Sequence, residues 1–186
     1  SHKIKHRASR TEFRHARVFA LAQGLEPLRT AVVHPVDRNS LLGAIDAATA
    51  GLIIPVLVGP EAKIRAVAAA EGVDLGPYRV VATRHSHEAA ERAVAMARAG
   101  EVEALMKGSL HTDELMGAVV ARDTGIRTAL RLSHCFVMDV PSHPEALIIS
   151  DAAVNIAPTL EDKVDIVQNA IDLARALGSE KVRVAI

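Results

Sequence analysis

Short apolar runs alternate along the chain with longer segments whose apolar residues recur every three or four positions. The short runs are bounded by turn-forming residues, as strands are. They lie at residues 30–33, 53–58, 79–82, 104–106, 132–140, 147–149 and 182–186. Helical spacing fills residues 9–24, 40–51, 60–67, 86–100, 115–120 and 158–177. Strands that alternate with helices through short turns predict an α/β fold with a mostly parallel sheet flanked by helices.

Residues that favour helix ends sharpen several of these boundaries. Ser9 begins a capping box, and Asn39 or Ser40 can cap the helix that follows the first strand. Pro60 stands where a helix takes proline as its first residue. Ser86 is the expected cap of the next helix.

Composition limits the number of domains and the classes of partner. With 186 residues and 49% hydrophobic content, the chain can form one sizeable core, with room for a small appended lobe. We assign residues 1–8 to a tag or linker arm and 9–186 to the folded part. The 22 basic and 22 acidic side chains balance, so the overall charge favours neither nucleic acid nor membrane. Aromatic residues make up 2%, which leaves few platforms for stacking bases.

The single cysteine, Cys135, lies in an apolar run and is expected to be a buried structural thiol. One cysteine allows no disulfide within the chain, which fits a reducing, cytoplasmic location. No signal peptide and no apolar span of membrane length is visible.

The richest stretch of polar chemistry runs from Met106 to Leu115. A Lys107-Gly108-Ser109 turn follows an apolar strand and precedes a helix. Such a turn can offer an ammonium group, a hydroxyl and free backbone N–H groups to an anion. An equally good interpretation is that Gly108 only turns the chain and Lys107 is solvated. Neither a Walker A loop nor a G-x-G-x-x-G fingerprint is present.

Three sequence blocks together resemble the phosphate acetyltransferase/phosphate butyryltransferase family. They are residues 104–113, residues 125–141 and residues 150–159. The Val33-His34-Pro35 and Val58-Gly59-Pro60 segments also fit, and the resemblance extends from about Phe13 to Ile186.

The resemblance implies an enzyme that interconverts acyl-CoA and phosphate with acyl phosphate and CoA. It implies a fold related to that of isocitrate and isopropylmalate dehydrogenases, a homodimer, CoA as a substrate and no permanently bound cofactor. Some relatives are fused to an enoyl-CoA hydratase-type domain, so a fused domain is a further possibility.

Two departures from the family pattern matter. Relatives continue beyond Ile186 and carry a Ser/Asp pair there. We therefore expect this chain to be incomplete at its carboxyl end and to have weak activity of its own. The catalytic roles of that pair cannot be assigned to any residue of this sequence. Acetyl-specific relatives also carry an arginine soon after the His-Thr pair. Here Asp113-Glu114-Leu115 follows instead, which favours the butyryl-type branch.

Acyl transfer from a thioester to phosphate requires contacts for phosphate and donors for a tetrahedral oxyanion. We assign the first contact to Lys107, Gly108 and Ser109, with His111 and Thr112 beside them. Arg131 and Ser133, at the start of a strand, are expected to supply a second. Asp151 and Asn155 are expected to line the same cleft, although a self-capped loop explains them as well. The candidate substrate-binding residues are therefore Lys107, Gly108, Ser109, His111, Thr112, Arg131, Ser133, Asp151 and Asn155.

Two other functions remain open at this point. A decarboxylating dehydrogenase on the related fold would need clustered aspartates for a metal, and no such cluster is visible. A non-catalytic domain that binds CoA or phosphate is also compatible with the sequence. His85 and His87 form the nearest approach to a metal motif, but no third ligand accompanies them, so no metal is expected.

Overall fold

The computed structural model describes residues 10–140, 142–143 and 146–186. The predicted arm of residues 1–8 and the predicted cap Ser9 lie outside them. The chain divides into two compact units. One is Leu25–Arg127, and the other comprises Thr128–Ile186 together with the described part of Ser1–Gly24.

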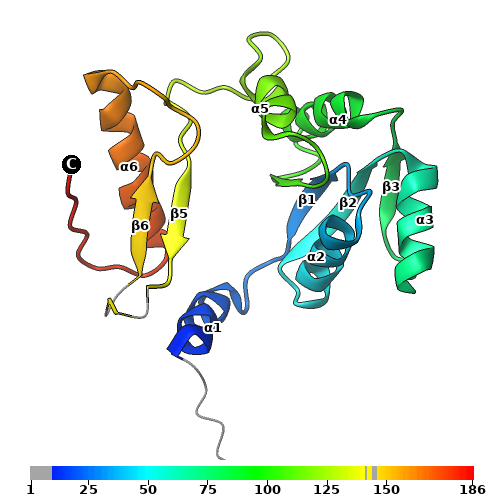
Figure 1. The fold of residues 1–186 in the computed structure, drawn as a ribbon, viewed down its shortest axis with the longest axis horizontal. Coiled ribbons are helices and arrows are strands. Elements are labelled where there is room, and N and C mark those ends of the chain that lie inside the picture. Colours follow the sequence, from blue (N-terminus) through cyan, green and yellow to red (C-terminus); the bar gives the residue numbers. More distant parts are fainter. Residues whose placement is uncertain (1–9, 141, 144–145) are drawn as a thin grey trace, which may run out of the picture. The chain divides into compact units, whose positions relative to one another are not determined.

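The Leu25–Arg127 unit alternates strands and helices throughout (Figure 1). Its elements are β1 (Leu28–Val33), α2 (Arg38–Thr49), β2 (Ile53–Gly59), α3 (Glu61–Glu71), β3 (Arg79–Ala82), α4 (Ser86–Arg98), β4 (Ala104–Lys107) and α5 (Thr112–Val120). The strands form a parallel sheet in the order β3-β2-β1-β4.

Helices cover both faces of this sheet because successive strand residues point to opposite sides. In β1, Val32 joins a core with Leu41 of α2 and Ile64 of α3. Its neighbour Val33 joins a second core with Met96 of α4. The predicted parallel, helix-flanked sheet is confirmed.

Three helix starts lie close to the predicted positions, but their capping residues differ. Asp37 caps α2 in place of Asn39 or Ser40, because its extended backbone places Oδ1 2.8 Å from the Ser40 N–H that it accepts. His85 caps α4, with Nδ1 accepting from the Glu88 N–H at 3.2 Å, so Ser86 is the first helical residue. Pro60 is the cap of α3 and Glu61 begins the helix.

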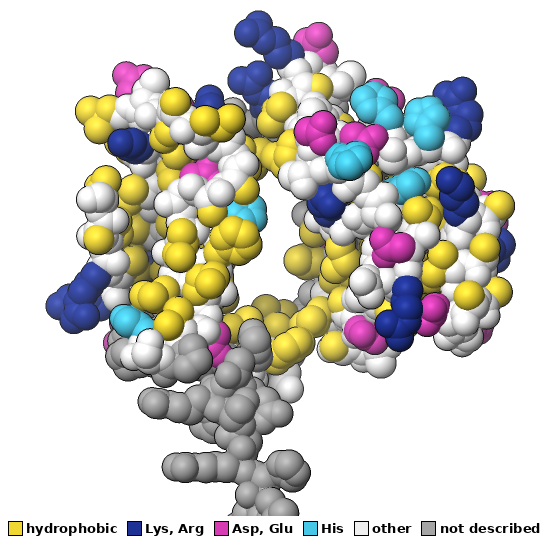
Figure 2. Space-filling view, in the orientation of Figure 1, with side chains coloured by type: hydrophobic (Ala, Val, Ile, Leu, Met, Phe, Trp, Pro, Cys, Tyr) yellow, Lys and Arg dark blue, Asp and Glu magenta, His cyan; other side chains and the backbone are white. Residues whose placement is uncertain are grey.

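The second unit holds α1 (Arg10–Ala22), β5 (Cys135–Met138), β6 (Leu147–Ser150) and α6 (Leu160–Ala176). The strands β5 and β6 pair in antiparallel fashion, with Phe136 opposite Ile149, and α6 packs against β6. Phe136, Met138 and Ile149 of this pair are exposed hydrophobic residues, and Figure 2 shows hydrophobic side chains at the surface of this unit.

Two strand predictions in this unit are corrected. The run 132–140 forms a strand only over β5, so Arg131 and Ser133 precede the strand. Residues 182–186 have no regular secondary structure. No described strand pairs with them, and an unpaired strand is not stable in water. Cys135 is partly exposed where a fully buried thiol was expected.

Candidate functional site

The Lys107-Gly108-Ser109 turn lies at the carboxyl end of β4. The chain passes from β1 outward to β2 and β3 and then returns to the other side of β1 as β4. Val33, the last residue of β1, is in register with Lys107. The carboxyl ends of β1 and β4 therefore meet where the strand order reverses, which is the usual ligand site of open α/β sheets. The predicted strand, turn and helix around Lys107 are confirmed.

Two backbone donors of this turn are already used, which corrects the prediction that they are free. The Gly108 N–H donates to the Val33 carbonyl at 2.9 Å, and the Ser109 N–H donates to the His34 carbonyl at the same distance. The ends of β1 and β4 lie so close that their backbone groups satisfy one another. An anion at this turn could use neither of these two N–H groups.

Gly108 is needed for this close approach. A Cβ at position 108 would lie 2.4 Å from the Val33 carbonyl oxygen and 2.8 Å from that of His34. Backbone atoms cannot yield as a flexible side chain can. Close packing against the end of β1 therefore explains why position 108 is a glycine, and no bound ligand is needed for that explanation.

His34 fixes the end of β1 to both neighbouring strands. Its N–H donates to the Val58 carbonyl at 2.7 Å, and its Nδ1 lies 2.6 Å from the Ser109 carbonyl oxygen. A carbonyl only accepts, so Nδ1 carries the hydrogen and Nε2 of the neutral ring is left as an acceptor. His34 also has a φ of 59°, which is uncommon for a residue with a side chain. Its role was missed because the sequence marked it only as part of a resemblance.

The charged side chain of Lys107 is accessible to solvent. The side chain is exposed, and its Nζ lies 3.5 Å from the Gly108 carbonyl oxygen. Within the part of the chain that the structure describes, no carboxylate forms an ion pair with Lys107. An ammonium group at a sheet's carboxyl edge can therefore contact an incoming anion.

Two carboxylates, those of Glu114 and Asp37, form hydrogen bonds with residues of this turn or of the helix start after it. Glu114 accepts from the Ser86 hydroxyl at 2.8 Å and from the His111 N–H at 3.0 Å, and these two bonds lower its pKa. The backbone N–H of Ser40 and then the side chain of Ser109 lower the pKa of Asp37. His111 and Thr112 are exposed at the start of α5. Figure 2 shows histidine side chains gathered over the α4 and α5 part of this unit.

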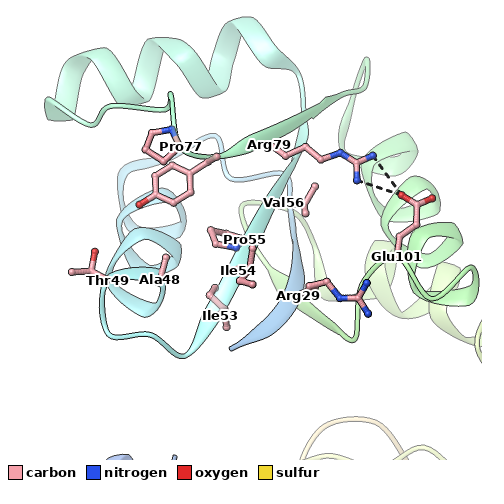
Figure 3. Close-up of a pocket in the computed structure, with 11 residues that line it drawn as sticks. Arg29, Ala48, Thr49, Ile53, Ile54, Pro55, Val56, Pro77, Arg79 and Glu101 are labelled. Carbon is pink, nitrogen blue, oxygen red and sulfur yellow. Dashed lines mark hydrogen bonds and ion pairs between the residues drawn. The ribbon is translucent and has the colours of Figure 1, made fainter. Parts of the chain in front are cut away.

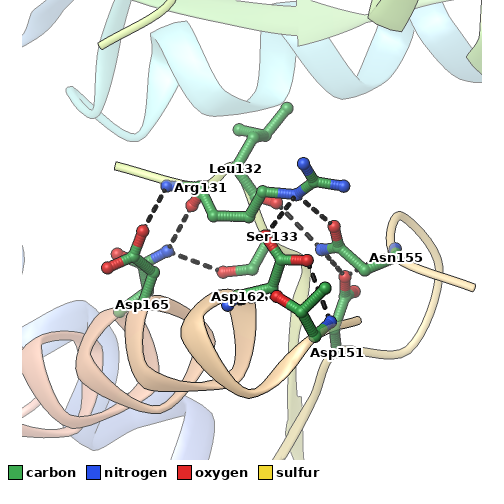
Figure 4. Close-up of polar contacts among 9 residues, drawn as sticks. Arg131, Leu132, Ser133, Asp151, Asn155, Asp162 and Asp165 are labelled. Carbon is green, nitrogen blue, oxygen red and sulfur yellow. Dashed lines mark hydrogen bonds and ion pairs between the residues drawn. The ribbon is translucent and has the colours of Figure 1, made fainter. Parts of the chain in front are cut away.

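The other four predicted residues come together in the second unit (Figure 4). Arg131 Nε donates to Asn155 Oδ1 at 2.7 Å, and Asn155 Nδ2 donates to the Leu132 carbonyl at 3.0 Å and to the Asp151 carboxylate. Ser133 accepts from Asn169 Nδ2 at 2.8 Å. The structure thus links Arg131 to Asn155 directly and to Asp151 through Asn155, while Ser133 joins through Asn169 of α6.

Asp151 is held as an anion by this loop. Burial would raise its pKa, but hydrogen bonds from the Ala153 backbone, the Asn155 side chain and the Val154 and Asn155 backbones together lower the pKa to about 2. A carboxyl group with that pKa remains ionised near neutral pH. Asp151 therefore orders the 151–155 loop, as the self-capping interpretation predicts.

The family profile described as "Phosphate acetyl/butaryl transferase" matches residues 81–186, which is more than half of the chain. The chain belongs to this family. The match contains all nine predicted substrate-binding residues, from Lys107 to Asn155.

Individual relatives agree with the family. The chain is 59% identical over 170 residues to a phosphate acetyltransferase of Rhizobium meliloti, covering 91% of this chain and 54% of the relative. It is 31% identical over 160 residues to a phosphate butyryltransferase of Clostridium acetobutylicum, covering 86% and 53%. The chain therefore spans about half the length of the curated relatives it matches.

The fold also has counterparts among solved structures. A phosphotransacetylase from Streptococcus pyogenes superposes with a TM-score of 0.77 over 90% of this chain and 59% of its own. The identity is 14%, so this likeness concerns the fold alone.

A pocket of about 620 Å³ lies at the amino ends of the parallel strands, the opposite end of the sheet from the Lys107 turn (Figure 3). Ile53, Pro55 and Tyr78 line it at the amino ends of the strands, and its Arg79 is paired with Glu101 at 3.4 Å. It contains none of the residues that the family's sequence blocks suggested. Its position at the amino edge separates it from the Lys107 turn.

The described residues contain no group of three or more His, Cys, Asp or Glu side chains that could hold a metal ion. His85 Nδ1 is used in capping α4, and His87 pairs with Glu91 at 3.3 Å. In the same part of the chain, no helix is both long and apolar enough to cross a membrane.

Proposed function

We propose that the protein transfers an acyl group between CoA and inorganic phosphate, interconverting acyl-CoA and phosphate with acyl phosphate and CoA. The observation that carries this proposal is the family match over residues 81–186, which contains both groups of candidate anion-binding residues. The exposed ammonium of Lys107, which forms no ion pair among the described residues, supports it from the carboxyl ends of the strands. The names of the relatives favour it over a dehydrogenase or a non-catalytic binding domain.

The reaction needs positioned charges more than it needs a reactive side chain. An oxygen of hydrogen phosphate attacks the thioester carbon and a tetrahedral oxyanion forms. The carbon–sulfur bond then breaks, and the leaving thiolate takes up the proton that the phosphate releases. We assign Lys107 to phosphate or to the acyl oxygen, with Ser109, His111 and Thr112 beside it. Arg131 is the second anion contact. Such contacts accelerate acyl transfer by holding phosphate against the thioester and stabilising developing charge.

Four residues take supporting roles in this proposal. Gly108 shapes the turn and offers no backbone donor. Asp151 and Asn155 order the loop beside Arg131, and Ser133 lies in the same network.

We also propose acetyl as the transferred group. The sequence after His111-Thr112 favours a butyryl-type enzyme, but the relatives at 57–59% identity are named phosphate acetyltransferases, whereas those named butyryltransferases with 160 matched residues reach 31–32%. Comparing kcat/KM for acetyl-CoA and butyryl-CoA decides between the two.

Other expectations from the resemblance are retained as proposals. They are CoA as a substrate without a resident cofactor, a cytoplasmic homodimer, a fold related to the isocitrate and isopropylmalate dehydrogenases, and a fused enoyl-CoA hydratase-type domain. Family membership supports the first of these most directly.

The Lys107→Ala variant tests the proposed site. We expect the KM for phosphate or CoA to rise by about tenfold or more, because a charge-assisted contact contributes about 1.5–3 kcal/mol. We expect the melting temperature to change no more than in Lys63→Ala, which removes an exposed lysine from α3. Equal KM values in Lys107→Ala and the unaltered protein would favour the solvated-turn interpretation.

A further inference from the structure

Helix α6 holds the Arg131 segment from several sides. The Arg131 N–H donates to Asp165 Oδ2 at 2.8 Å, and the Arg131 carbonyl accepts from Asn169 Nδ2 at 3.0 Å. Asp165 and Asn169 are four residues apart and so lie on the same face of the helix. Both backbone polar groups of Arg131 are thereby fixed by one element.

The guanidinium group is also held, but only through its Nε atom. Arg131 Nε donates to Asn155 and lies 3.6 Å from Asp162 Oδ1. Asp162 is itself held by the Thr159 cap at the start of α6. Figure 4 shows the two terminal nitrogens of the guanidinium pointing away from these partners. Among the described residues, the hydrogen bond and the ion pair of the Arg131 side chain are both made through Nε.

This arrangement is unusual for an arginine that serves only the fold. A structural arginine this close to the Asp162 carboxylate would be expected to use its terminal nitrogens, since paired N–H donors make the strongest contacts with a carboxylate. Here the donors best suited to a tetrahedral oxyanion remain free, while the backbone and Nε are immobilised. The side chain is 52% exposed, so a ligand can reach it.

We propose that Asp165 and Asn169 are positioning residues for substrate binding, acting through Arg131 to hold its terminal nitrogens toward a phosphate group of the substrate. This inference rests on the proposed acyl transfer to phosphate. The phosphate group is either inorganic phosphate or one of the phosphates of CoA. Holding the arginine in advance reduces the entropy that binding would otherwise cost.

The test is a double-mutant cycle in the whole protein, with KM for phosphate and KM for CoA measured separately. We expect Asp165→Leu to raise one of these KM values by about tenfold, and Arg131→Ala to raise the same one. In the Arg131→Ala background, Asp165→Leu should have no further effect, because its role is exercised through that side chain. The substrate whose KM responds identifies the source of the phosphate group.

Matched variants separate positioning from stability. Asp165→Asn keeps an oxygen acceptor for the Arg131 N–H and should retain a near-normal KM. Asp172→Leu removes an acid from the same helix whose bond is with Gln168, and should change neither KM. If Asp165→Leu does not fold, Asn169→Leu takes its place in the cycle, because it removes the donor to the Arg131 carbonyl.

The possible results lead to different conclusions. A KM within twofold of normal in both α6 variants, or effects that add to that of Arg131→Ala, overturns the positioning role alone. Unchanged KM values in Arg131→Ala overturn its assignment as an anion contact, and the positioning role with it. Absence of phosphate-dependent turnover in the unaltered protein overturns the proposed function itself.

Discussion

At Gly108, the backbone after β4 passes so close to the end of β1 that no side chain can be accommodated. The nearest obstacles are the carbonyl oxygens of Val33 and His34, which also accept the hydrogen bonds from Gly108 and Ser109. A side chain here would therefore break the pairing that positions Lys107.

We expect Gly108→Ala to destabilise the protein by roughly 1–3 kcal/mol, the usual cost of forcing atoms into a packed region. The matched control is Gly117→Ala in α5, where a Cβ meets no atom within 4 Å. Alanine is the better helix former, so this control should raise stability by about 0.5–1 kcal/mol. Urea unfolding measures both. Equal stability in the two variants would contradict the close approach at Gly108.

Asp151 gives the protein a stability that depends on pH. Its pKa in the folded protein is about 2, below the ordinary value of 3.8, so folding favours the carboxylate. This stabilisation is fully present above about pH 4 and is lost as the pH falls towards 2. Asp151→Asn removes the titrating group and places an amide against four backbone donors. The difference in melting temperature between the unaltered protein and this variant should become smaller from pH 4 to pH 2. A constant difference would contradict the lowered pKa of Asp151.

Sequence reasoning found the chemically capable residues but not their partners. Lys107 and Arg131 stand out because charged groups beside turns are visible in the sequence. Asp165 and Asn169 are 34 and 38 residues from Arg131, and nothing local marks them as its partners. The use of the Gly108 N–H was also hidden, because it depends on how closely β1 and β4 approach.

At the scale of elements, periodicity located the helices better than residue preferences located their caps. Asp37, Asn39 and Ser40 are all good capping residues, and only backbone geometry decides among them. Asp37 has the extended conformation of a cap, and its carboxylate accepts from Ser40. The strand predicted at residues 182–186 failed for a related reason, since a strand depends on a partner that the local sequence does not specify.

Replacing Asp37 with alanine should cost about 1 kcal/mol, because it removes the cap of α2. Asn39→Ala, two residues later and exposed, should have a much smaller effect. Melting temperatures of the two variants make the comparison. A larger decrease in melting temperature in Asn39→Ala than in the Asp37 variant would indicate that Asn39, and not Asp37, caps α2.

At the scale of the whole molecule, the predicted substrate-binding residues fall into two groups in two units. Lys107 to Thr112 belong to Leu25–Arg127, and Arg131 to Asn155 belong to the other unit. Each group has side-chain nitrogen donors free to contact an anion. The family profile spans both groups, and the chain spans about half of its curated relatives. Acyl transfer is therefore a proposal about the whole protein that two separate observations support.

The central claim is tested most directly by incubating the whole protein with acetyl-CoA and inorganic phosphate and measuring both products. The account predicts that free CoA and acetyl phosphate form in equal amounts, that neither forms without phosphate, and that acetyl phosphate with CoA regenerates acetyl-CoA. Release of CoA without acetyl phosphate would indicate a thioesterase, and no turnover with any acyl-CoA would indicate a binding domain. Either result would contradict the account.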